Sequence, residues 1–268
     1  MNPRNRNKSR TIEAEDSLDR WGRDPNRSLS NSFFEAAYRK WFRVEWEGLE
    51  NIPSSGGALL VANHAGMMPV DGGIIQFGVH EETGRPVYML AHHGFFQFPF
   101  VGRVLNRTGT VVAHPNNAHR LLQEDQRLVV VFPEGEKGPV KARSERYRLQ
   151  RFGRGGFVET AMRADVPIVP VVLMGTEDTT PTIANLDLGG RSVPLTLNTA
   201  LFGPLLGAVA HFPAKIRARV LPPVTFDSDP ERLAPTRSIL MDRAEAIRGD
   251  MQLTLDEMLA NREDVWLG

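Results

Sequence analysis

Residues 128–135 read Leu-Val-Val-Val-Phe-Pro-Glu-Gly, and this stretch decides the fold. An unbroken apolar run rich in β-branched residues is typical of a strand buried on both faces, as in a parallel sheet. The Pro-Glu-Gly that follows ends the strand in a turn. Ligands of such sheets bind at the carboxyl ends of the strands, where an acid and a glycine turn suit hydroxyl recognition. Glu134 and Gly135 are therefore candidate site residues.

Similar apolar runs recur on both sides of this strand and alternate with helical stretches. We expect further strands at 58–62, 87–90, 110–113, 168–173 and 216–220, and helices at 72–79, 100–105, 117–124 and 155–164. Such alternation indicates βαβ units. The sequence therefore predicts an α/β fold with a largely parallel central sheet flanked by helices.

The rest of the chain falls into a tail, two terminal helices and a loop-rich region. Residues 1–27 are polar without a repeating apolar face and are expected to be a disordered tail. Apolar residues recur every four positions over 28–42, which predicts an amphipathic helix that packs on the domain or lies in a membrane interface. Residues 176–213 carry prolines typical of loops, and a helical tail is expected at about 230–260. We interpret 28–268 as a single domain.

Composition excludes several function classes. The 268 residues are 41% hydrophobic and 24% charged, which suits a globular domain with its own core. Lysine plus arginine (32) equals aspartate plus glutamate (32), so no overall charge draws the protein to nucleic acid. There is no cysteine, which excludes disulfides, thiolate zinc sites and thiol nucleophiles.

The chain is expected to be cytoplasmic. Its basic first ten residues are followed by polar sequence, so no secretory signal is predicted. The longest apolar run, 201–212, is about half of the roughly 20 residues that a membrane-spanning helix needs. It is expected either to pack in the protein or to lie in a membrane interface.

A histidine and an aspartate follow the strand predicted at 58–62. His64 precedes a Gly- and Pro-containing turn, and a helix is expected to start close to Asp71. A carboxylate on one ring nitrogen fixes the tautomer and raises the basicity of the other nitrogen, as a general base requires. The alternative is a structural histidine beside a helix-terminal aspartate.

A strongly basic stretch follows the Pro-Glu-Gly turn. Residues 137–154 hold seven lysines and arginines, including Lys137 and Arg143, but one acid, Glu145. We expect a solvated loop or a site for a phosphate or an anionic headgroup.

Other chemistries lack their motifs. The chain has no Gly-x-Ser-x-Gly elbow, no Walker loop and no His-Glu-x-x-His zinc motif. The histidines at 92, 93, 114 and 119 have no acidic residue at a compatible spacing, so no metal site is expected.

Three ordered motifs carry a resemblance to a known family. Asn63-His64 with Asp71, Phe132-Pro-Glu-Gly135 and the strand 166–171 (Val-Pro-Ile-Val-Pro-Val) resemble the glycerolipid (lysophospholipid) acyltransferases, the family that includes 1-acylglycerol-3-phosphate acyltransferase. The resemblance covers roughly residues 44–226. It implies an O-acyltransferase of lipid metabolism, as in phospholipid biosynthesis, which moves a fatty acyl group from acyl-CoA or acyl-carrier protein to a glycerolipid hydroxyl.

The resemblance also implies residue roles. His64 is expected to be the general base and Asp71 its orienting carboxylate, while Glu134 and Gly135 shape the acceptor pocket. No covalent acyl-enzyme and no cofactor are expected, since the acyl thioester is a co-substrate. The expected binding partners of this protein are then the thioester donor, the lipid acceptor and a membrane surface.

This sequence departs from the common family pattern in three places. Six residues separate His64 from Asp71, where the family usually has four, a spacing similar to that of the mono- and diacylglycerol acyltransferase branch. Lys137 stands where the family has an arginine, and the family's second arginine motif is missing, so Arg107 or Arg120 is the candidate substitute. The two changed phosphate contacts weaken the expectation of a phosphorylated acceptor such as lysophosphatidate and strengthen that of a neutral glycerolipid or another lipid alcohol, so that a lysophospholipid and a mono- or diacylglycerol both stay open as acceptors.

Two other interpretations stay open. The first is a non-catalytic lipid- or acyl-carrier-binding relative of the same fold, and the second is a hydrolase in which the same pair activates water. A lipid substrate further predicts peripheral binding on the inner face of the membrane, with Phe96, Leu205 and Leu206 as contact residues. Liposome binding and acyl-transfer assays distinguish these interpretations.

Overall fold

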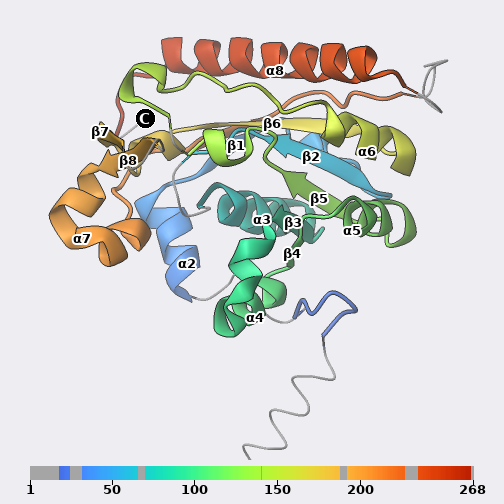
Figure 1. The fold of residues 1–268 in the computed structure, drawn as a ribbon, viewed down its shortest axis with the longest axis horizontal. Coiled ribbons are helices and arrows are strands. Elements are labelled where there is room, and N and C mark those ends of the chain that lie inside the picture. Colours follow the sequence, from blue (N-terminus) through green and yellow to red (C-terminus); the bar gives the residue numbers. More distant parts are fainter. Residues whose placement is uncertain are drawn as a thin grey trace, which may run out of the picture.

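The computed structural model describes residues 18–24, 32–65, 70–139, 141–187, 192–226 and 235–266. In these residues the chain forms a seven-stranded sheet and a separate two-stranded hairpin (Figure 1). The sheet contains β1 (Glu45–Glu47), β2 (Ala58–Ala62), β3 (Val87–Ala91), β4 (Thr110–Val112), β5 (Leu128–Val131), β6 (Ile168–Met174) and β9 (Arg217–Val220). The hairpin contains β7 (Thr182–Asp187) and β8 (Ser192–Thr196).

Helices connect and cover these strands. The α-helices are α2 (Ser32–Ala36), α3 (Val70–Thr83), α4 (Pro99–Arg107), α5 (Pro115–His119), α6 (Gly156–Ala164), α7 (Leu197–Val209) and α8 (Arg237–Ala260). Shorter helical segments are η1 (Ala37–Trp41), η2 (Leu49–Asn51), η3 (His93–Gln97), η4 (Arg120–Glu124), η5 (Gly135–Lys137), η6 (Arg143–Glu145) and η7 (Thr176–Asp178).

The central sheet is mostly parallel, as predicted. Its strand order is β1-β9-β6-β2-β5-β3-β4, and the strands from β6 to β4 all run in one direction. β9 runs antiparallel to β6 and parallel to the short edge strand β1. Every residue of β2 and β6 is buried, which explains their unbroken apolar sequences.

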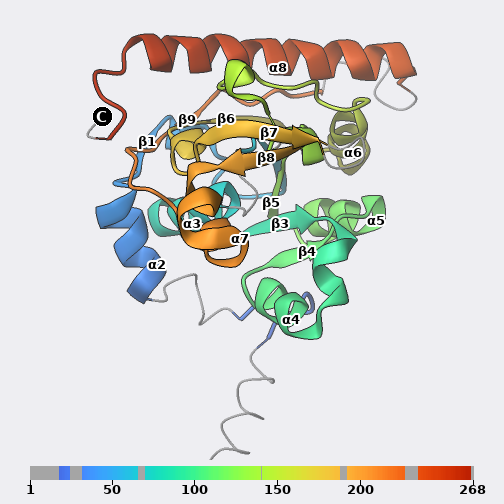
Figure 2. The same ribbon diagram turned by 60° about the vertical axis from the view of Figure 1, so that its left-hand side comes forward.

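The two faces of the sheet carry different helices. Leu59 and Val61 of β2 point into a core shared with α6 and α8, whereas Leu60 points into a core shared with α3. Figures 1 and 2 show α8 along one side of the sheet and α2, α4 and α7 on the other. The five parallel strands all end at the same edge of the sheet, because they run in one direction.

The first helical segment packs on the domain. Tyr38 and Phe42 are buried, and the ring of Tyr38 lies 4.7 Å from that of Phe77 in α3. Of the two alternatives for this segment, packing on the domain or lying in a membrane interface, the structure shows packing on the domain. The predicted C-terminal helix is present as α8, where the side chain of Thr236 caps the N-terminus by accepting from Ile239 N.

The prediction of a tail over residues 1–27 is wrong for residues 18–24. The indole N–H of Trp21 donates to Asp125 Oδ2 at 2.6 Å, and the hydroxyl of Tyr88 donates to Asp19. Trp21 also packs against the core. One aromatic anchor therefore holds a polar segment in place, and residues 1–17 and 25–27 lie outside the described residues.

The region 176–213 is more regular than predicted, since it forms β7, β8 and α7. Pro194, which has no N–H to donate, lies in a two-stranded hairpin, where each strand has one side without a partner strand. In α7, Gly203 and Pro204 introduce a kink instead of ending the helix. Among the described residues, no helix has the length and apolar content needed to cross a bilayer.

Candidate active site

Asn63 fixes the end of β2. Its buried side-chain amide donates to Leu173 O at 2.9 Å, and its carbonyl oxygen accepts from Leu173 N at 2.7 Å. These two bonds join the end of β2 to β6 at the point where the main-chain ladder stops. The next residue, His64, therefore leaves the sheet at its carboxyl edge in a fixed direction.

His64 and Asp71 form the predicted pair. Nδ1 of His64 lies 2.7 Å from Asp71 Oδ2, which also accepts from Ala65 N at 2.7 Å. Asp71 lies in the first turn of α3 with its side chain fully buried, while the His64 side chain is 17% exposed. The carboxylate thus holds the ring through Nδ1 and leaves Nε2 as the nitrogen that can accept a proton.

The imidazole is also held by packing. The ring of Phe132, which directly follows β5, stacks on His64 with 4.6 Å between ring centroids. Gly138 also lies against His64. A Cβ on Gly138 would lie 2.9 Å from the carbonyl oxygen of His64 and 3.0 Å from the Cβ of His64. Glycine at 138 therefore allows the loop after β5 to approach the histidine closely.

Glu134 accepts a hydrogen bond from the backbone of His64 and does not line the cavity described below. Its Oε1 accepts from His64 N at 3.0 Å, and its Oε2 accepts from Gln150 N at 2.7 Å and pairs with Lys141 Nζ at 3.1 Å. Both carboxylate oxygens are bonded within the protein. The prediction that Glu134 meets the acceptor is corrected accordingly: Glu134 positions the histidine.

Lys141 was expected in a solvated or ligand-binding basic loop, but it is buried between two carboxylates. Nζ lies 3.1 Å from Glu134 Oε2 and 3.1 Å from Glu177 Oε1. Burial lowers the pKa of the Lys141 ammonium, but the two carboxylates outweigh this, so its pKa lies above the ordinary value. Burial likewise raises the pKa of Glu177, and Lys141 partly offsets it.

A second buried network adjoins this cluster and was not predicted. Asp178 Oδ2 accepts from the Tyr147 hydroxyl at 2.7 Å and from Arg262 Nη1 at 2.6 Å, and Arg146 also pairs with Asp178. Gly175 starts the turn that carries Asp178, with φ of +100° and Lys215 O only 2.2 Å from where a Cβ would stand. Arg146, like Lys141, is therefore neutralised within the protein.

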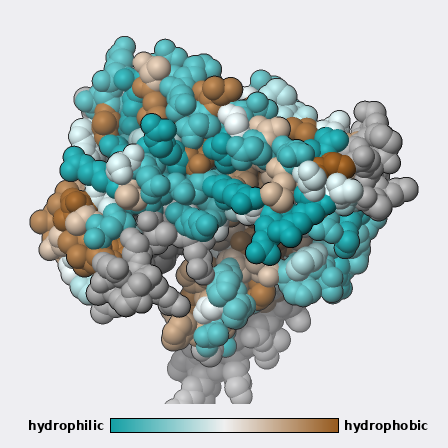
Figure 3. All heavy atoms as spheres, turned by 45° about the horizontal axis from the view of Figure 1, so that its top comes forward, coloured by the Kyte–Doolittle hydropathy of each residue, from teal (hydrophilic) through white to brown (hydrophobic). Residues whose placement is uncertain are grey.

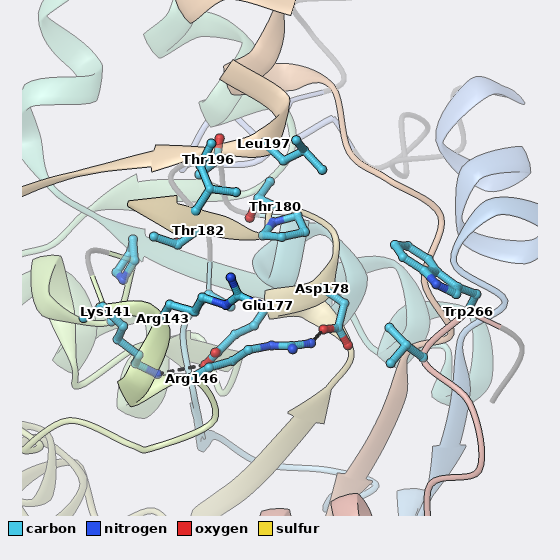
Figure 4. A pocket seen from close by; sticks show the side chains of 17 residues that line it. Lys141, Arg143, Arg146, Glu177, Asp178, Thr180, Thr182, Thr196, Leu197 and Trp266 are labelled. Carbon is cyan, nitrogen blue, oxygen red and sulfur yellow. Dashed lines mark hydrogen bonds and ion pairs between the residues drawn. The ribbon is translucent and has the colours of Figure 1, made fainter. Parts of the chain in front are cut away.

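A cavity of about 390 Å³ adjoins the residues that flank His64, whereas His64 and Asp71 themselves are not among its lining residues (Figure 4). Ala65 and Gly138, which flank His64, form part of its wall, and Figure 4 shows Lys141, Glu177 and Arg146 along one side. The other lining residues are Pro139, Ala142, Arg143, Asp178, Thr180, Pro181, Thr182, Ile183, Thr196, Leu197, Val265 and Trp266. Its size is typical of a small-molecule site.

Gly135 and Lys137 lie near the cavity without lining it. Gly135 is exposed in the turn after β5, where it has φ of +57° and its N–H donates to Phe132 O. The Lys137 side chain is exposed on η5. Arg143 is the predicted basic-stretch residue that does line the cavity, and it forms no ion pair with the described part of the chain.

Arg107 and Arg120, the arginines predicted to bind the acceptor, lie away from both His64 and the cavity. Arg107 ends α4 and precedes β4, and the start of a parallel strand is the sheet edge opposite to His64. Arg120 is exposed, lies over the Trp21 ring at 5.7 Å and pairs with Glu124 at 3.5 Å. Neither residue lines the cavity.

The three expected membrane-contact residues differ in position. Leu206 on α7 is 66% exposed, whereas Phe96 in η3 is only partly exposed. The side chain of Leu205 lies outside the described residues. In the described ranges, no three histidine, aspartate or glutamate side chains come together as a metal-binding group.

Comparison with known proteins adds to this geometry. Residues 43–174 match the family model described as Acyltransferase. An uncharacterized protein of Mycobacterium leprae is 38% identical over 259 residues, covering 94% of this chain and 70% of that protein. A Bos taurus protein called DGAT1/2-independent enzyme synthesizing storage lipids is 24% identical, covering 84% of this chain and 67% of that protein.

A solved structure is similar in fold. It is the 1-acyl-sn-glycerophosphate (LPA) acyltransferase PlsC of Thermotoga maritima, with a TM-score of 0.57 and 20% sequence identity. The match covers 87% of this chain and 79% of that structure. The predicted sheet with flanking helices is thus found in a solved relative.

Proposed function

This chain belongs to the glycerolipid acyltransferase family and is an acyltransferase, and from this premise we propose which reaction it performs. It moves a fatty acyl group from a thioester, acyl-CoA or acyl-carrier protein, to a hydroxyl of a glycerolipid, with His64 as the general base. The observation that carries the proposal is the 2.7 Å contact between His64 Nδ1 and Asp71 Oδ2, next to Ala65, which lines the cavity.

The proposed step is a direct transfer. His64 Nε2 takes the proton of the acceptor hydroxyl while its oxygen attacks the thioester carbonyl, and the C–S bond then breaks. The imidazolium returns the proton to the leaving thiolate, and Asp71 stabilises the imidazolium in between. The chain has no cysteine to form a thioester intermediate, and no cofactor enters the reaction because the thioester is the co-substrate.

The same geometry weighs against a non-catalytic relative. A lipid-binding protein needs the cavity but not a histidine whose ring is fixed by a buried carboxylate, a stacked phenylalanine and a glycine contact. A hydrolase uses the same base, and it is distinguished by its product. Assays that separate free fatty acid from acylated lipid decide between transfer and hydrolysis.

We propose a neutral glycerolipid, mono- or diacylglycerol, as the acceptor. Of the cations expected to bind a phosphate, Lys137, Arg107 and Arg120 do not line the cavity, while Arg143 does. The CoA donor itself carries phosphates, so one unpaired arginine does not require a phosphorylated acceptor. The name of the bovine relative, an enzyme synthesizing storage lipids, supports the same choice.

The acceptor is tested with Arg143→Ala. We expect monoacylglycerol to be acylated with a higher kcat/KM than lysophosphatidate, and the variant to keep the KM for monoacylglycerol within about twofold. A phosphate contact by Arg143 is contradicted by this result, because losing a hydrogen bond to a charged group costs about 1.5–3 kcal/mol, at least about tenfold in KM. Preference for lysophosphatidate with a tenfold loss in the variant overturns the neutral acceptor.

We further propose that the protein binds the cytoplasmic face of a membrane peripherally. Residues 192–214 contain no aspartate, glutamate, lysine or arginine. Within this stretch, α7 exposes large apolar side chains. The exposed set on η3, α4 and α7 is Phe95, Phe98, Phe100, Val101, Val104, Leu201, Phe202, Leu206 and Val209. Figure 3 shows a hydrophobic group at its left-hand edge, where α7 lies in Figure 1. Such a surface suits the interface of a bilayer.

Liposome flotation tests the membrane contact. We expect the wild type to float, more strongly with anionic lipid and less in high salt, and Leu201→Ser with Leu206→Ser to bind about tenfold or more weakly. Leu253→Ser is the matched control, since Leu253 is 70% exposed but lies on α8, across the sheet. Equal binding by the double variant and the control moves the contact away from α7.

A further inference from the structure

The segment that follows α8 returns to the cavity and forms part of its wall. Val265 and Trp266 line the cavity together with Ile183, Leu197 and Pro181. Figure 4 shows Trp266 on the side of the cavity away from Lys141. The Trp266 side chain is not part of the core, because 45% of the residue is exposed. A large ring is thus presented to an open site.

Arg262 holds this segment in place. Its Nη2 donates to Val265 O at 2.7 Å and its Nε to Asp264 O at 3.2 Å, while Nη1 donates to Asp178 Oδ2 at 2.6 Å. Its side chain is only 6% exposed. One guanidinium therefore satisfies two carbonyls of the segment and pairs with a buried acid of the cavity wall.

The two ends of Trp266's backbone are held as well. Its N–H donates to Asp264 Oδ1 at 2.6 Å, and its carbonyl oxygen accepts from the guanidinium of Arg43, which precedes β1. The first bond lies within the segment, and the second ties the backbone of Trp266 to the chain before β1. The position of Trp266 is therefore set before any ligand enters the cavity.

The same framework reaches the histidine. Asp178 adjoins Glu177, which bonds to Lys141, and Lys141 bonds to Glu134, which accepts the backbone N–H of His64. The segment and the base are thus linked through two buried clusters, one at Asp178 and one at Lys141, which adjoin at the neighbouring residues 177 and 178. A change in the wall at Trp266 alters the space for a substrate without removing a group that holds the base.

We propose that residues 262–266 form a specificity-determining wall, in which Trp266 contacts the apolar part of the lipid substrate and Arg262 is the positioning residue. The proposal rests on the proposed function. The occupant is an acyl chain or glyceride backbone, because Trp266 lines the cavity together with the apolar side chains of Ile183 in β7 and Leu197 in α7. The wall limits the length or bulk of the chain that the cavity accepts.

Kinetics over a series of acyl-CoA chain lengths test the wall. We expect Trp266→Ala to raise the KM of the substrate that contacts it about tenfold or more, to shift the preferred chain toward longer ones, and to leave kcat within about threefold. Trp266→Phe restores most of the KM. Arg262→Met behaves like Trp266→Ala, Arg262→Lys loses less, and Arg154→Met, an exposed arginine outside the cavity, is the matched control.

Fluorescence separates failure of this inference from failure of the proposed function. The difference between wild type and Trp266→Phe isolates Trp266 emission, which we expect to change on titration with a non-hydrolysable acyl-CoA thioether. Chain-length preference and KM unchanged in folded Trp266→Ala overturn the wall. A wild type without acyl transfer overturns the proposed function, and the thioether titration then decides the wall. If Arg262→Met does not fold, Arg262→Lys and Trp266→Ala decide it.

Discussion

Replacement of His64 by alanine is expected to lower kcat for acyl transfer by about 100- to 10,000-fold, the usual worth of a general base. The fold should persist although the ring contacts with Asp71 and Phe132 are lost, because alanine keeps the backbone N–H that donates to Glu134 and Asp71 Oδ2 still accepts from Ala65 N. Asp71→Asn is expected to lose most of the activity, since an amide holds the ring in a different tautomer and stabilises the imidazolium less. Turnover of radiolabelled acyl-CoA with monoacylglycerol measures both.

His119→Ala is the matched control, because His119 belongs to α5, away from Asp71 and the carboxyl end of β2. Its turnover should equal that of the wild type. Circular dichroism and thermal melting of all three variants establish that they are folded. Near-normal turnover by folded His64→Ala contradicts the proposed mechanism and leaves the cavity as a binding site.

The strands and the contact between His64 and Asp71 were predictable because their signals are local. Unbroken apolar runs such as 128–131 and 168–173 are required wherever a strand is covered on both faces, so composition alone marks them. His64 and Asp71 follow one strand and begin the next helix. The two residues are only seven positions apart in the sequence, so their contact requires no distant part of the chain.

The supporting ion pairs were not predictable because they join distant parts of the chain. Lys141 belongs to a run of basic residues that looks solvated, and only its tertiary partner Glu177, 36 residues away, shows that it is buried. Arg262 and Asp178 are 84 residues apart. A sequence pattern contains no sign of such pairs, since each residue alone resembles an ordinary surface charge.

The position of Arg107 could have been predicted from the topology of the sheet. A helix that leaves the carboxyl end of β3 must return to the amino end of β4 before a parallel strand can begin. Its last residues, Arg107 included, therefore lie at the edge opposite to the site. The βαβ pattern itself excludes this residue once helix direction is considered together with strand order.

Replacement of Lys141 by methionine is expected to destabilise the protein by about 3–5 kcal/mol, the cost of leaving a buried charge without its partner. Lys141 is 5% exposed at its side chain, and it separates the carboxylates of Glu134, fully buried, and Glu177, 11% exposed. Without the ammonium, two acids face each other in a site that water barely reaches. Lys137→Met is the matched control, because Lys137 is exposed on the neighbouring turn. Urea unfolding at pH 8 measures the difference.

The size of this loss should fall as the pH falls. Burial already raises the pKa of Glu177 above its ordinary 4.5, so the folded state binds that proton more tightly than the unfolded chain does. Such a group favours folding below its unfolded pKa, and this contribution is lost as the pH rises through the folded pKa. Lys141→Met removes the cation that lowers the pKa of Glu177, so the pH range in which a protonated Glu177 favours folding extends upward. The stability difference between wild type and variant is therefore expected to be smaller at pH 5.5 than at pH 8.

A second replacement separates charge from packing. In the Lys141→Met background, Glu177→Gln removes one of the two unpaired acids, so it should recover part of the lost stability, although in the wild type the same change removes a partner of Lys141 and destabilises. A change of sign between the two backgrounds identifies an electrostatic origin. Loss of stability that is equal at pH 5.5 and pH 8, with Glu177→Gln destabilising in both backgrounds, would instead trace the effect to the space that the lysine side chain fills.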